Sequence, residues 1–470
     1  MTQRIILCVD IGTSALKASF IDARGHNHGF VREAYSREQL VRGVVTGSDW
    51  EKAFVRARGV LAKQAPDLKP DALCISGNGP TLVPLTEGGE SLAPLHWYNG
   101  RADAPRIPEP LPSLFLPYAA GFLQENPEAY ERTRYLFSAP EWLSFQCGAE
   151  PVTVLPSPLY EPSYWDETQC RKFGLDQDKF PPFVPLGSPI GGVSAKAAEY
   201  FDLPQGIPII AGGPDFIMAL IGVGAIEPGI VCDRAGTSEG INYCTPAPVY
   251  IPGFRTLPHV EAGFWNLGAI LPASGRFFDW YRELTGQTDG GYDELLEELI
   301  GKSVPPGSGA ALSPGEGLFF PALPFLDKPS AAGLFMAFPG LLNRTGFGRA
   351  VLEALGFLVR DALEIFSSHG FPITEMRLSG GQSKNARWNQ LKADLTACTL
   401  LLPEIRDGEL AGDACIAARA LGEFSSLPQA VSGMIRFTGS YIPSPQKASL
   451  YTERFHVYQE LKERARSFRG

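Results

Sequence analysis

The 470-residue sequence lacks several features that would place it in a particular class of protein. Its eight cysteines are scattered, with no Cys-x-x-Cys pair and no His/Cys spacing typical of a metal site, so we expect reduced core thiols. No segment reaches the ~18 uninterrupted apolar residues of a membrane span, and the first apolar stretch is too short for a signal peptide. These absences predict a cytoplasmic protein with no membrane partner.

The sequence also lacks an excess of basic residues. It has 51 Asp and Glu against 41 Lys and Arg, which gives a formal net charge of -10. A chain this acidic has no general attraction for the phosphate backbone, so we expect no nucleic-acid partner and favour small molecules. The hydrophobic content of 44% is enough for large cores, and ~100–200 residues per domain predicts two to four compact units.

Strand-like and helix-like patterns alternate along the chain, which predicts an α/β protein. The pattern is interrupted near residues 245–255, so we expect two α/β domains, 1–245 and 246–470. Proline-rich segments 104–117 and 156–162 are expected to be irregular. The other expected elements are a hairpin of residues 5–9 and 16–21, helices over 49–64, 215–224, 349–370, 384–397 and 410–422, and strands over 71–76, 207–211, 229–233, 241–244, 375–379 and 399–403.

A first glycine-rich turn lies in DIGTSALK, residues 10–17, directly after the apolar run IILCV. Its glycine allows the backbone to approach an anion, and the Thr13 and Ser14 hydroxyls can donate to phosphate oxygens. Lys17 supplies positive charge, and Asp10 would orient a magnesium-bound water. An ordinary hairpin with a polar tip explains this octet equally well.

Two further turns of this kind follow. DRAGTSEG, residues 233–240, again places glycine, threonine and serine after a strand, and two such turns in one α/β chain suggest a pincer around a polyphosphate. In LSGGQSKNARWNQLKAD, residues 378–394, a strand ends in two glycines before a helix. Neither G-x-G-x-x-G nor a Walker motif is present, since GKS at 301–303 has Leu296 where the first glycine belongs. A nucleotide site here is of neither kind.

Taken together, the motifs resemble the FGGY family of carbohydrate kinases, within the actin/hexokinase/Hsp70-like ATPases. Besides the three turns, the resemblance rests on LHWYNGRA (95–102), LPQGIPIIAGGPDF (203–216), RAVLEALGFLVRD (349–361) and the tail 440–461. It implies two ribonuclease H-like domains with an interdomain cleft. Domain 1–245 would hold the sugar site, the first phosphate turn and the catalytic base, and domain 246–470 would bind adenosine. ATP with magnesium, a small sugar or polyol acceptor and, as is common in the family, a homodimer are also implied.

The same resemblance assigns roles to individual residues. Asp215 in GGPDF matches the catalytic base, although an aspartate at a strand-to-helix junction would also suit a helix cap. The family pattern further implies Asp10 on the magnesium side, Thr13, Ser14 and Lys17 at the first phosphate contacts, Gly236 and Thr237 at the second, Gly275 and Asp279 near the nucleotide, and Gly381 and Asn385 at the adenosine.

The acceptor-side motifs depart from those of xylulokinases and glycerol kinases. Neither Gln-Met-His-Gly nor an Arg-Glu pair follows the strand near residue 76, and the family's W-x-D-x-R has an amide in place of its carboxylate. Apolar side chains replace polar ones beside the base, so we expect an acceptor with fewer hydroxyls, a deoxy position or an acidic group. The expected substrate residues are Asn78, Gly79, Pro80, Trp97, Asn99 and Phe216.

Two other functions remain open on the sequence alone. A non-catalytic nucleotide-binding sensor or regulator would keep the same fold, but it would have no need of Asp10, Lys17 and Asp215 together. An ATP hydrolase of the actin or Hsp70 type is disfavoured by LHWYNGRA and by the C-terminal tail.

Overall fold

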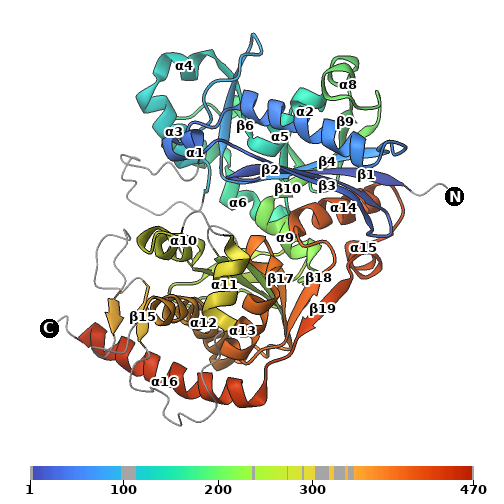
Figure 1. Cartoon of the computed structure of the whole chain (residues 1–470). Coiled ribbons are helices and arrows are strands. Elements are labelled where there is room, and N and C mark those ends of the chain that lie inside the picture. The colour runs from blue at the N-terminus through green and yellow to red at the C-terminus, as the bar shows by residue number, and fades with distance from the viewer. Residues whose placement is uncertain are drawn as a thin grey trace. The chain divides into compact units, whose positions relative to one another are not determined.

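The computed structural model describes residues 4–96, 113–235, 239–271, 274–287, 291–301, 317–321, 334–336 and 343–467. The chain forms two compact units, each built on a large mixed β-sheet with helices against it (Figure 1). Unit 1 comprises Met1–Ile226, Leu257–Trp265 and Asp407–Arg436. Unit 2 comprises Glu227–Thr256, Asn266–Arg406 and Phe437–Gly470.

The compact units therefore do not divide at a single point near residue 245. Residues 227–245 belong to unit 2, because their strand β11 (Ile230–Ala235) pairs in parallel with β17 (Glu375–Ser379). Residues 407–436 belong to unit 1, because helix α14 (Gly408–Ala420) packs against β1 (Ile5–Ile11). Pairing and packing partners distant in sequence decide which unit a segment joins.

The main sheet of unit 1 has six strands in the order β3-β2-β1-β4-β10-β9. The expected N-terminal hairpin is present, because β1 pairs antiparallel with β2. Strands β1, β4 and β10 run parallel, so their carboxyl ends lie at one edge of the sheet. The remaining bounds are β2 Ala15–Asp22, β3 Asn27–Ala34, β4 Ala72–Gly77, β9 Pro189–Gly192 and β10 Pro208–Pro214.

Helices and short strands complete unit 1. The helices are α1 Arg37–Arg42, α2 Gly47–Gln64, α3 Leu116–Glu125, α4 Pro127–Arg132, α5 Ala139–Cys147, α6 Glu161–Tyr164, α7 Glu167–Phe173, α8 Ala195–Phe201, α9 Asp215–Gly222 and α15 Leu427–Met434. The short strands are β5 Leu82–Thr86, β6 Thr133–Ser138, β7 Thr153–Leu155 and β8 Phe183–Pro185. Segment 156–162, expected to be irregular, instead carries a 3₁₀ turn, Pro158–Tyr160, and the start of α6, because proline suits the first turn of a helix.

Helices α9 and α14 cross at very short distance in unit 1. A Cβ added at Gly222 would lie 1.8 Å from the Gly408 carbonyl oxygen, and one added at Gly412 would lie 2.1 Å from the Met218 oxygen. Only glycine allows the two backbones to approach this closely. The contact sets the position of the N-terminal ends of both helices, where acidic residues of the candidate site lie.

Unit 2 repeats the arrangement of a hairpin followed by parallel strands. Its seven-stranded sheet has the order β13-β14-β12-β11-β17-β18-β19, with β11, β17 and β18 parallel. The strands are β12 Glu239–Thr245, β13 Arg255–Pro258, β14 Trp265–Leu271, β15 Leu318–Phe320, β16 Leu334–Met336, β18 Leu400–Pro403 and β19 Phe437–Tyr441. The helices are α10 Ser274–Leu284, α11 Tyr292–Gly301, α12 Arg344–Ser368, α13 Ala386–Thr396 and α16 Pro445–Ser467.

The sheet of unit 2 is covered by a continuous apolar core. Buried side chains of α12, such as Val359 and Phe366, pack with Val231 and Met376 of the sheet. This core explains why the apolar runs of the sequence predicted these strands and the long helix correctly. Within the described residues, no helix is both long enough and apolar enough to span a bilayer.

Candidate active-site residues

The hairpin β1–β2 explains the spacing of Asp10 and Lys17. The two residues face each other across the antiparallel pair, and Lys17 Nζ lies 3.2 Å from Asp10 Oδ2. A seven-residue separation is what a tight turn needs to bring both side chains to the carboxyl end of β1. The polar turn between them makes one hydrogen bond of its own, from Gly12 N to Ala15 O at 3.0 Å.

Two more carboxylates, which the sequence analysis did not identify, surround Lys17. Asp407 Oδ1 lies 3.3 Å and Glu409 Oε2 lies 3.6 Å from Lys17 Nζ. Both follow β18 in the sequence and begin α14. The available signal was the acidic pair in RDGEL just after a predicted strand, a position comparable to that of Asp10 after β1.

The electrostatics of this cluster follow from one ammonium among three carboxyl groups. Burial alone would lower the pKa of Lys17, but Glu409, Asp10 and Asp407 outweigh it and hold that pKa above its ordinary value. Burial also raises the pKa of Asp10, which Lys17 opposes and which Glu409 and Asp215 raise further. Lys17 therefore stays charged among the three carboxyl groups, and burial makes Asp10 bind a proton more readily than an ordinary aspartate.

Asp10 has the features needed to hold a magnesium ion. Its Oδ1 atom is buried and accepts no hydrogen bond from the described residues. Carboxylate oxygens suit this hard cation, which proteins usually hold through one or two carboxylates together with substrate phosphates and water. Within the described ranges, no three His, Cys, Asp or Glu side chains are grouped to hold a metal by themselves. The residues therefore fit a magnesium ion that arrives with a phosphate ligand.

A buried acid on α14, Asp413, connects this helix to strand β4 next to the Lys17 cluster. Asp413 Oδ2 accepts hydrogen bonds from Ser76 Oγ at 2.9 Å, and Asp413 Oδ1 accepts one from Cys74 Sγ at 3.7 Å. Burial raises the pKa of Asp413 well above its ordinary value. The hydrogen bonds of Asp413 to β4 hold α14 on the sheet, and so they help to position Asp407 and Glu409 beside Lys17.

The first turn presents polar groups that are half-buried. Thr13 and Ser14 lie at its tip, and the Ser14 hydroxyl accepts a hydrogen bond from Arg32 Nη2 at 3.3 Å. Arg32 is exposed on β3 and was not singled out in the sequence. The structure thus adds a second cation beside the turn expected to contact phosphate.

Asp215 begins α9 at the carboxyl end of β10. The N-cap position of α9 is occupied by Pro214, and no side chain caps this helix end through that residue. Asp215 is therefore not the N-cap residue, and it lies close enough to Asp10 to raise the pKa of that carboxyl. Phe216, the next residue, is half-buried.

A narrow pocket of about 20 Å³ lies at the carboxyl ends of β4 and β10. It brings together Asn78 and Gly79, which the sequence predicted as substrate residues, with Pro214 next to Asp215. Pro80, the residue after Gly79, is half-buried and does not line the pocket. Residues that the sequence analysis missed complete the pocket: Gly77, Phe115, Ser138, Pro140, Glu141, Tyr164, Gly212 and Gly213.

The polar groups of this pocket are largely engaged with the protein. Asn78 donates from Nδ2 to Ile11 O at 3.0 Å and accepts at Oδ1 from Thr81 at 2.8 Å. Glu141 accepts hydrogen bonds from the backbone N–H groups of Ser138 at 3.0 Å and Val154 at 2.6 Å. Burial raises the pKa of Glu141. A ligand in this pocket meets aromatic faces and glycine backbone more than free polar side chains.

In unit 2, the second and third glycine-rich turns follow neighbouring parallel strands. Strand β11 ends at Ala235 and β17 at Ser379, and a Cβ added at Gly380 would lie 2.4 Å from the Ala235 carbonyl oxygen. Gly380 has a φ of 88°, which favours glycine. The second turn thus belongs to unit 2 beside the third, although the sequence placed it in domain 1–245. Gly236 and Thr237 themselves lie outside the described residues.

Two of the predicted adenosine and nucleotide residues, Asn385 and Asp279, are hydrogen-bonded to the neighbouring residues Asp293 and Tyr292 of α11. Asn385 caps α13, since its Oδ1 accepts from Trp388 N at 2.9 Å, and its Nδ2 donates to Asp293 Oδ1. Tyr292, adjacent to Asp293, donates a hydrogen bond to Asp279. The other two predicted positions in the described part of unit 2 are glycines. Gly381 begins the 3₁₀ turn before α13, and Gly275 lies in the first turn of α10.

The structure thus groups most of the predicted residues within their own units. Unit 1 holds Asp10, Thr13, Ser14, Lys17, Asn78, Gly79 and Asp215 at one edge of its sheet. Trp97 and Asn99 lie outside the described residues.

Comparison with known proteins agrees with the resemblance seen in the sequence. The family model described as "FGGY family of carbohydrate kinases, C-terminal domain" matches residues 234–421. An autoinducer-2 kinase from Salmonella paratyphi B is 26% identical over 370 residues, covering 74% of this chain and 67% of that protein. A xylulose kinase from Bacillus subtilis is 24% identical over 500 residues, covering 98% of this chain and 97% of that protein.

Solved structures share the fold. A kinase from Brucella ovis, described as a xyloylose kinase, has a TM-score of 0.80 at 20% identity, with 99% of this chain and 100% of that chain covered. A gluconate kinase from Lactobacillus acidophilus also has a TM-score of 0.80 at 20% identity, with 98% of both chains covered. The expected fold of two ribonuclease H-like domains is confirmed. The chain thus matches the FGGY carbohydrate kinase model over residues 234–421, and it is similar over most of its length to sugar kinases.

Proposed function

We propose that this protein transfers a phosphoryl group from ATP to a hydroxyl of a small sugar or polyol. The observation that carries the proposal is the grouping of three charged residues at the carboxyl ends of the parallel strands of unit 1. Asp10 of β1 faces Lys17 of β2, and Asp215 directly follows β10. Phosphoryl transfer needs positioning, charge compensation and a carboxylate that accepts a proton, and these three side chains supply such groups. The kinase names of the relatives support the same activity.

Asp215 is the proposed general base. As the acceptor hydroxyl oxygen attacks the γ-phosphorus of ATP, the carboxylate takes the hydroxyl proton, and the bond to the leaving oxygen of ADP breaks. Thr13 and Ser14 donate hydrogen bonds to phosphate oxygens from the first turn. Lys17 stays protonated among its carboxylates and contributes positive charge toward the phosphates.

Asp10 is the proposed magnesium-side residue, with Asp407 and Glu409 as nearby carboxylates. Magnesium bound there would offset charge on the phosphates. Because Asp10 Oδ1 is buried without a partner among the described residues, a cation would also relieve the cost of burying that oxygen. Gly381, Asn385 and Asp279 of unit 2, together with Gly236 and Thr237, are the proposed nucleotide contacts, and Gly275 is proposed to approach the nucleotide with them.

The acceptor is proposed to bind at the carboxyl ends of β4 and β10, with the residues of the small pocket there forming one side of its site. The side chain of Asn78 is already hydrogen-bonded, and Glu141 is engaged by two backbone N–H groups. A hydroxyl buried against Phe115 or Tyr164 would lose water without gaining a partner, which costs ~1–3 kcal/mol. These contacts support an acceptor that has few hydroxyls or a deoxy position. An acidic group would find no cation among the residues that line this pocket.

One assay tests the activity and the substrate class together. ADP release is measured with ATP and magnesium, with and without xylulose, ribulose, glycerol, deoxy-ketoses and sugar acids. A kinase releases ADP strongly with particular acceptors, a hydrolase releases it equally with all, and a non-catalytic sensor releases none. Comparing kcat/KM ranks the acceptors, and xylulose as the best one would contradict the proposed preference.

A further inference from the structure

A second buried lysine lies in unit 2, away from the residues assigned so far. Lys392 Nζ donates to Asp233 Oδ2 at 2.6 Å and to Glu239 Oε1 at 2.7 Å. The three side chains are at most 2% exposed. Lys392 also lies 5.4 Å from the centre of the Trp388 ring on the same helix. Lys392, Asp233 and Glu239 form what we call the buried triad.

The buried triad joins three elements that flank two glycine-rich turns. Asp233 lies near the end of β11, and Glu239 is the first residue of β12, paired in register with Ala235. The chain between those two paired positions is residues 236–238. Lys392 lies on α13, the helix that begins at Asn385 directly after the third turn. One ammonium therefore connects the helix after the third turn to both strands that flank the second.

The energetics make a purely stabilising role a poor explanation. Bringing three ionisable groups out of water is expensive, and apolar side chains of similar volume often stabilise a protein as well or better. Burial raises the pKa of Asp233, and the nearby Glu239 raises it further against the opposing effect of Lys392. One proton shared by the two acids would leave the triad without net charge. Such a triad instead fixes the relative positions of β11, β12 and α13, because each hydrogen bond requires a particular distance and direction between its two side chains.

We propose that Lys392 is a positioning residue for ATP: it holds the strand ends on either side of residues 236–238 in a fixed relation to the turn at Gly380–Asn385. The inference rests on the proposed function, because it assumes that these turns bind the nucleotide. A Cβ added at Gly380 would lie 2.4 Å from the Ala235 carbonyl oxygen, so there is little space between the third turn and the end of β11, and a small shift of β11 would affect both turns. Lys392 acts through the backbone and touches no substrate.

The test compares Lys392→Met with a control that breaks another buried ion pair of the same unit. Arg454 Nε lies 2.7 Å from Glu353 Oε2, and both side chains are about as buried as those of the triad. Arg454→Met removes a cation between α16 and α12, which the triad does not involve. Dissociation constants for ATP and AMP are measured by calorimetry on the full chain, with thermal unfolding recorded for every variant.

We expect Lys392→Met to weaken ATP binding by about tenfold or more, since small misplacements of binding groups carry penalties of this order. AMP, which lacks the outer phosphates, should be affected less. Lys392→Arg should restore most of the ATP affinity. Arg454→Met should lower the unfolding temperature comparably and leave ATP affinity unchanged. If Lys392→Met fails to fold, Lys392→Met with Asp233→Asn removes one buried acid as well, and the same loss of ATP affinity is expected.

Unchanged ATP affinity in the lysine variants, an equal loss for AMP, or an equal loss in Arg454→Met would overturn the inference. In each of these cases the unaltered chain still binds ATP, so the proposed function stands. Failure of the unaltered chain to bind ATP would instead reject the proposed function and the inference together.

Discussion

The two units share a sheet topology, and each has a lysine among carboxylates near the carboxyl ends of its parallel strands. They differ in how far that lysine is enclosed. The Lys17 side chain is 18% exposed, whereas that of Lys392 is 2% exposed. An open cluster can exchange one of its partners for a ligand, but a closed one can only hold its own protein atoms in place. The same residue types therefore suit binding in unit 1 and support in unit 2.

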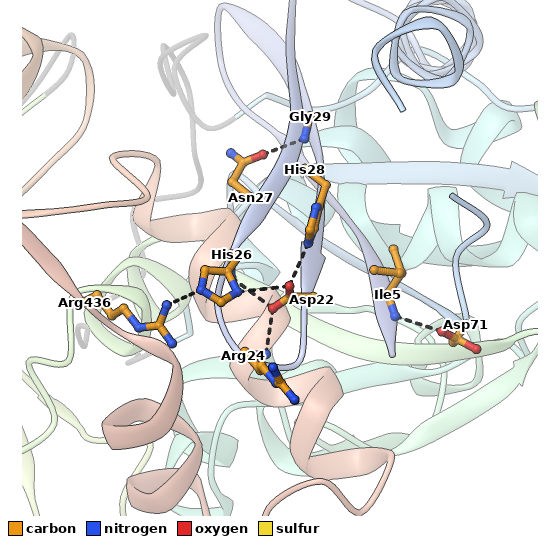
Figure 2. Close-up of polar contacts among 9 residues, drawn as sticks. All are labelled: Ile5, Asp22, Arg24, His26, Asn27, His28, Gly29, Asp71 and Arg436. Carbon is orange, nitrogen blue, oxygen red and sulfur yellow. Dashed lines mark hydrogen bonds and ion pairs between the residues drawn. The ribbon is translucent and has the colours of Figure 1, made fainter. Parts of the chain in front are cut away.

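A third charged cluster shows that such networks also occur far from the site. Figure 2 shows Asp22 receiving hydrogen bonds from the imidazoles of His26 and His28, with Arg436 against the other side of the His26 ring. Asp22 is fully buried, and the hydrogen bonds it accepts lower its pKa despite burial. This cluster joins the turn between β2 and β3 to Arg436, which follows α15. The His26 and His28 side chains are 43% and 35% exposed, so exposure alone does not make a charged cluster a site, and its location at the ends of the parallel strands also matters.

The largest expected effect concerns Asp215, the proposed general base of unit 1, which should control turnover but not nucleotide binding. We expect Asp215→Asn to lower kcat by ~10²–10⁴-fold, because loss of a general base removes proton acceptance from the attacking hydroxyl. The dissociation constant for ATP should stay near that of the unaltered chain. Asp166→Asn, at the N-cap of α7, is a matched control and should keep full turnover. Normal turnover in Asp215→Asn would place the base elsewhere.

The position of the acidic residues on α14 depends on the crossing of α9 and α14. Gly412→Ala should destabilise the protein by about 3 kcal/mol, because the new Cβ would lie 2.1 Å from the Met218 carbonyl oxygen. Gly121→Ala on α3 is the control, since its Cβ meets nothing within 4 Å, and it should stabilise slightly. Urea unfolding measures both. Equal stability of the two variants would show that the crossing relaxes easily.

One contribution to the stability of unit 1 should be lost in mild acid through His259. Burial lowers the pKa of His259 in unit 1 to about 4, and its ring accepts from Glu261 N while facing Ala225 O, so the folded state keeps it neutral. The unfolded chain binds the proton from its ordinary pKa of 6.5 downward, so stability is lost as pH falls from about 6.5 to about 4. In unit 2, Arg454 and Arg349 hold the pKa of Glu353 below its ordinary value against burial, so that contribution is lost only at lower pH.

From pH 7 to pH 5, His259 by itself should lower the free energy of unfolding by about 2 kcal/mol. Urea titrations at both pH values measure it, and His259→Gln should reduce the difference. A variant that keeps the full pH dependence would assign the loss to other groups.

The smallest expected effect concerns the acceptor pocket alone. A Cβ at Gly79 meets nothing within 4 Å, so Gly79→Ala should change stability by no more than about 0.5 kcal/mol. The methyl group would narrow a small pocket, and we expect KM for the acceptor to rise several-fold while ATP affinity is retained. Gly59→Ala, on α2 with equally open surroundings, is the control and should change neither the acceptor KM nor the ATP affinity. An unchanged acceptor KM in Gly79→Ala would place the acceptor outside this pocket.

Local patterns in the sequence were sufficient for most elements and for part of the site. Short apolar runs predicted the hairpin β1–β2 and the parallel strands, because strands such as β1 and β4 are buried on both faces, and the long helix α12 was predicted from its helical pattern. The turn DIGTSALK could be recognised because its glycine, hydroxyls and charges lie within eight consecutive residues. The FGGY resemblance rested on several such short motifs in the right order, and it is confirmed.

What the sequence could not determine are relations between segments far apart in the chain. Asp407 and Glu409 reach Lys17 only because α14 folds back onto the sheet of unit 1, some 390 residues later in the sequence. Phe115, Glu141 and Tyr164 meet Gly79 only in the folded pocket. The membership of β11 in unit 2 depends on its pairing with β17. Periodicity reports which face of an element is buried, whereas its partners depend on packing across the whole unit, and tertiary structure alone decides them.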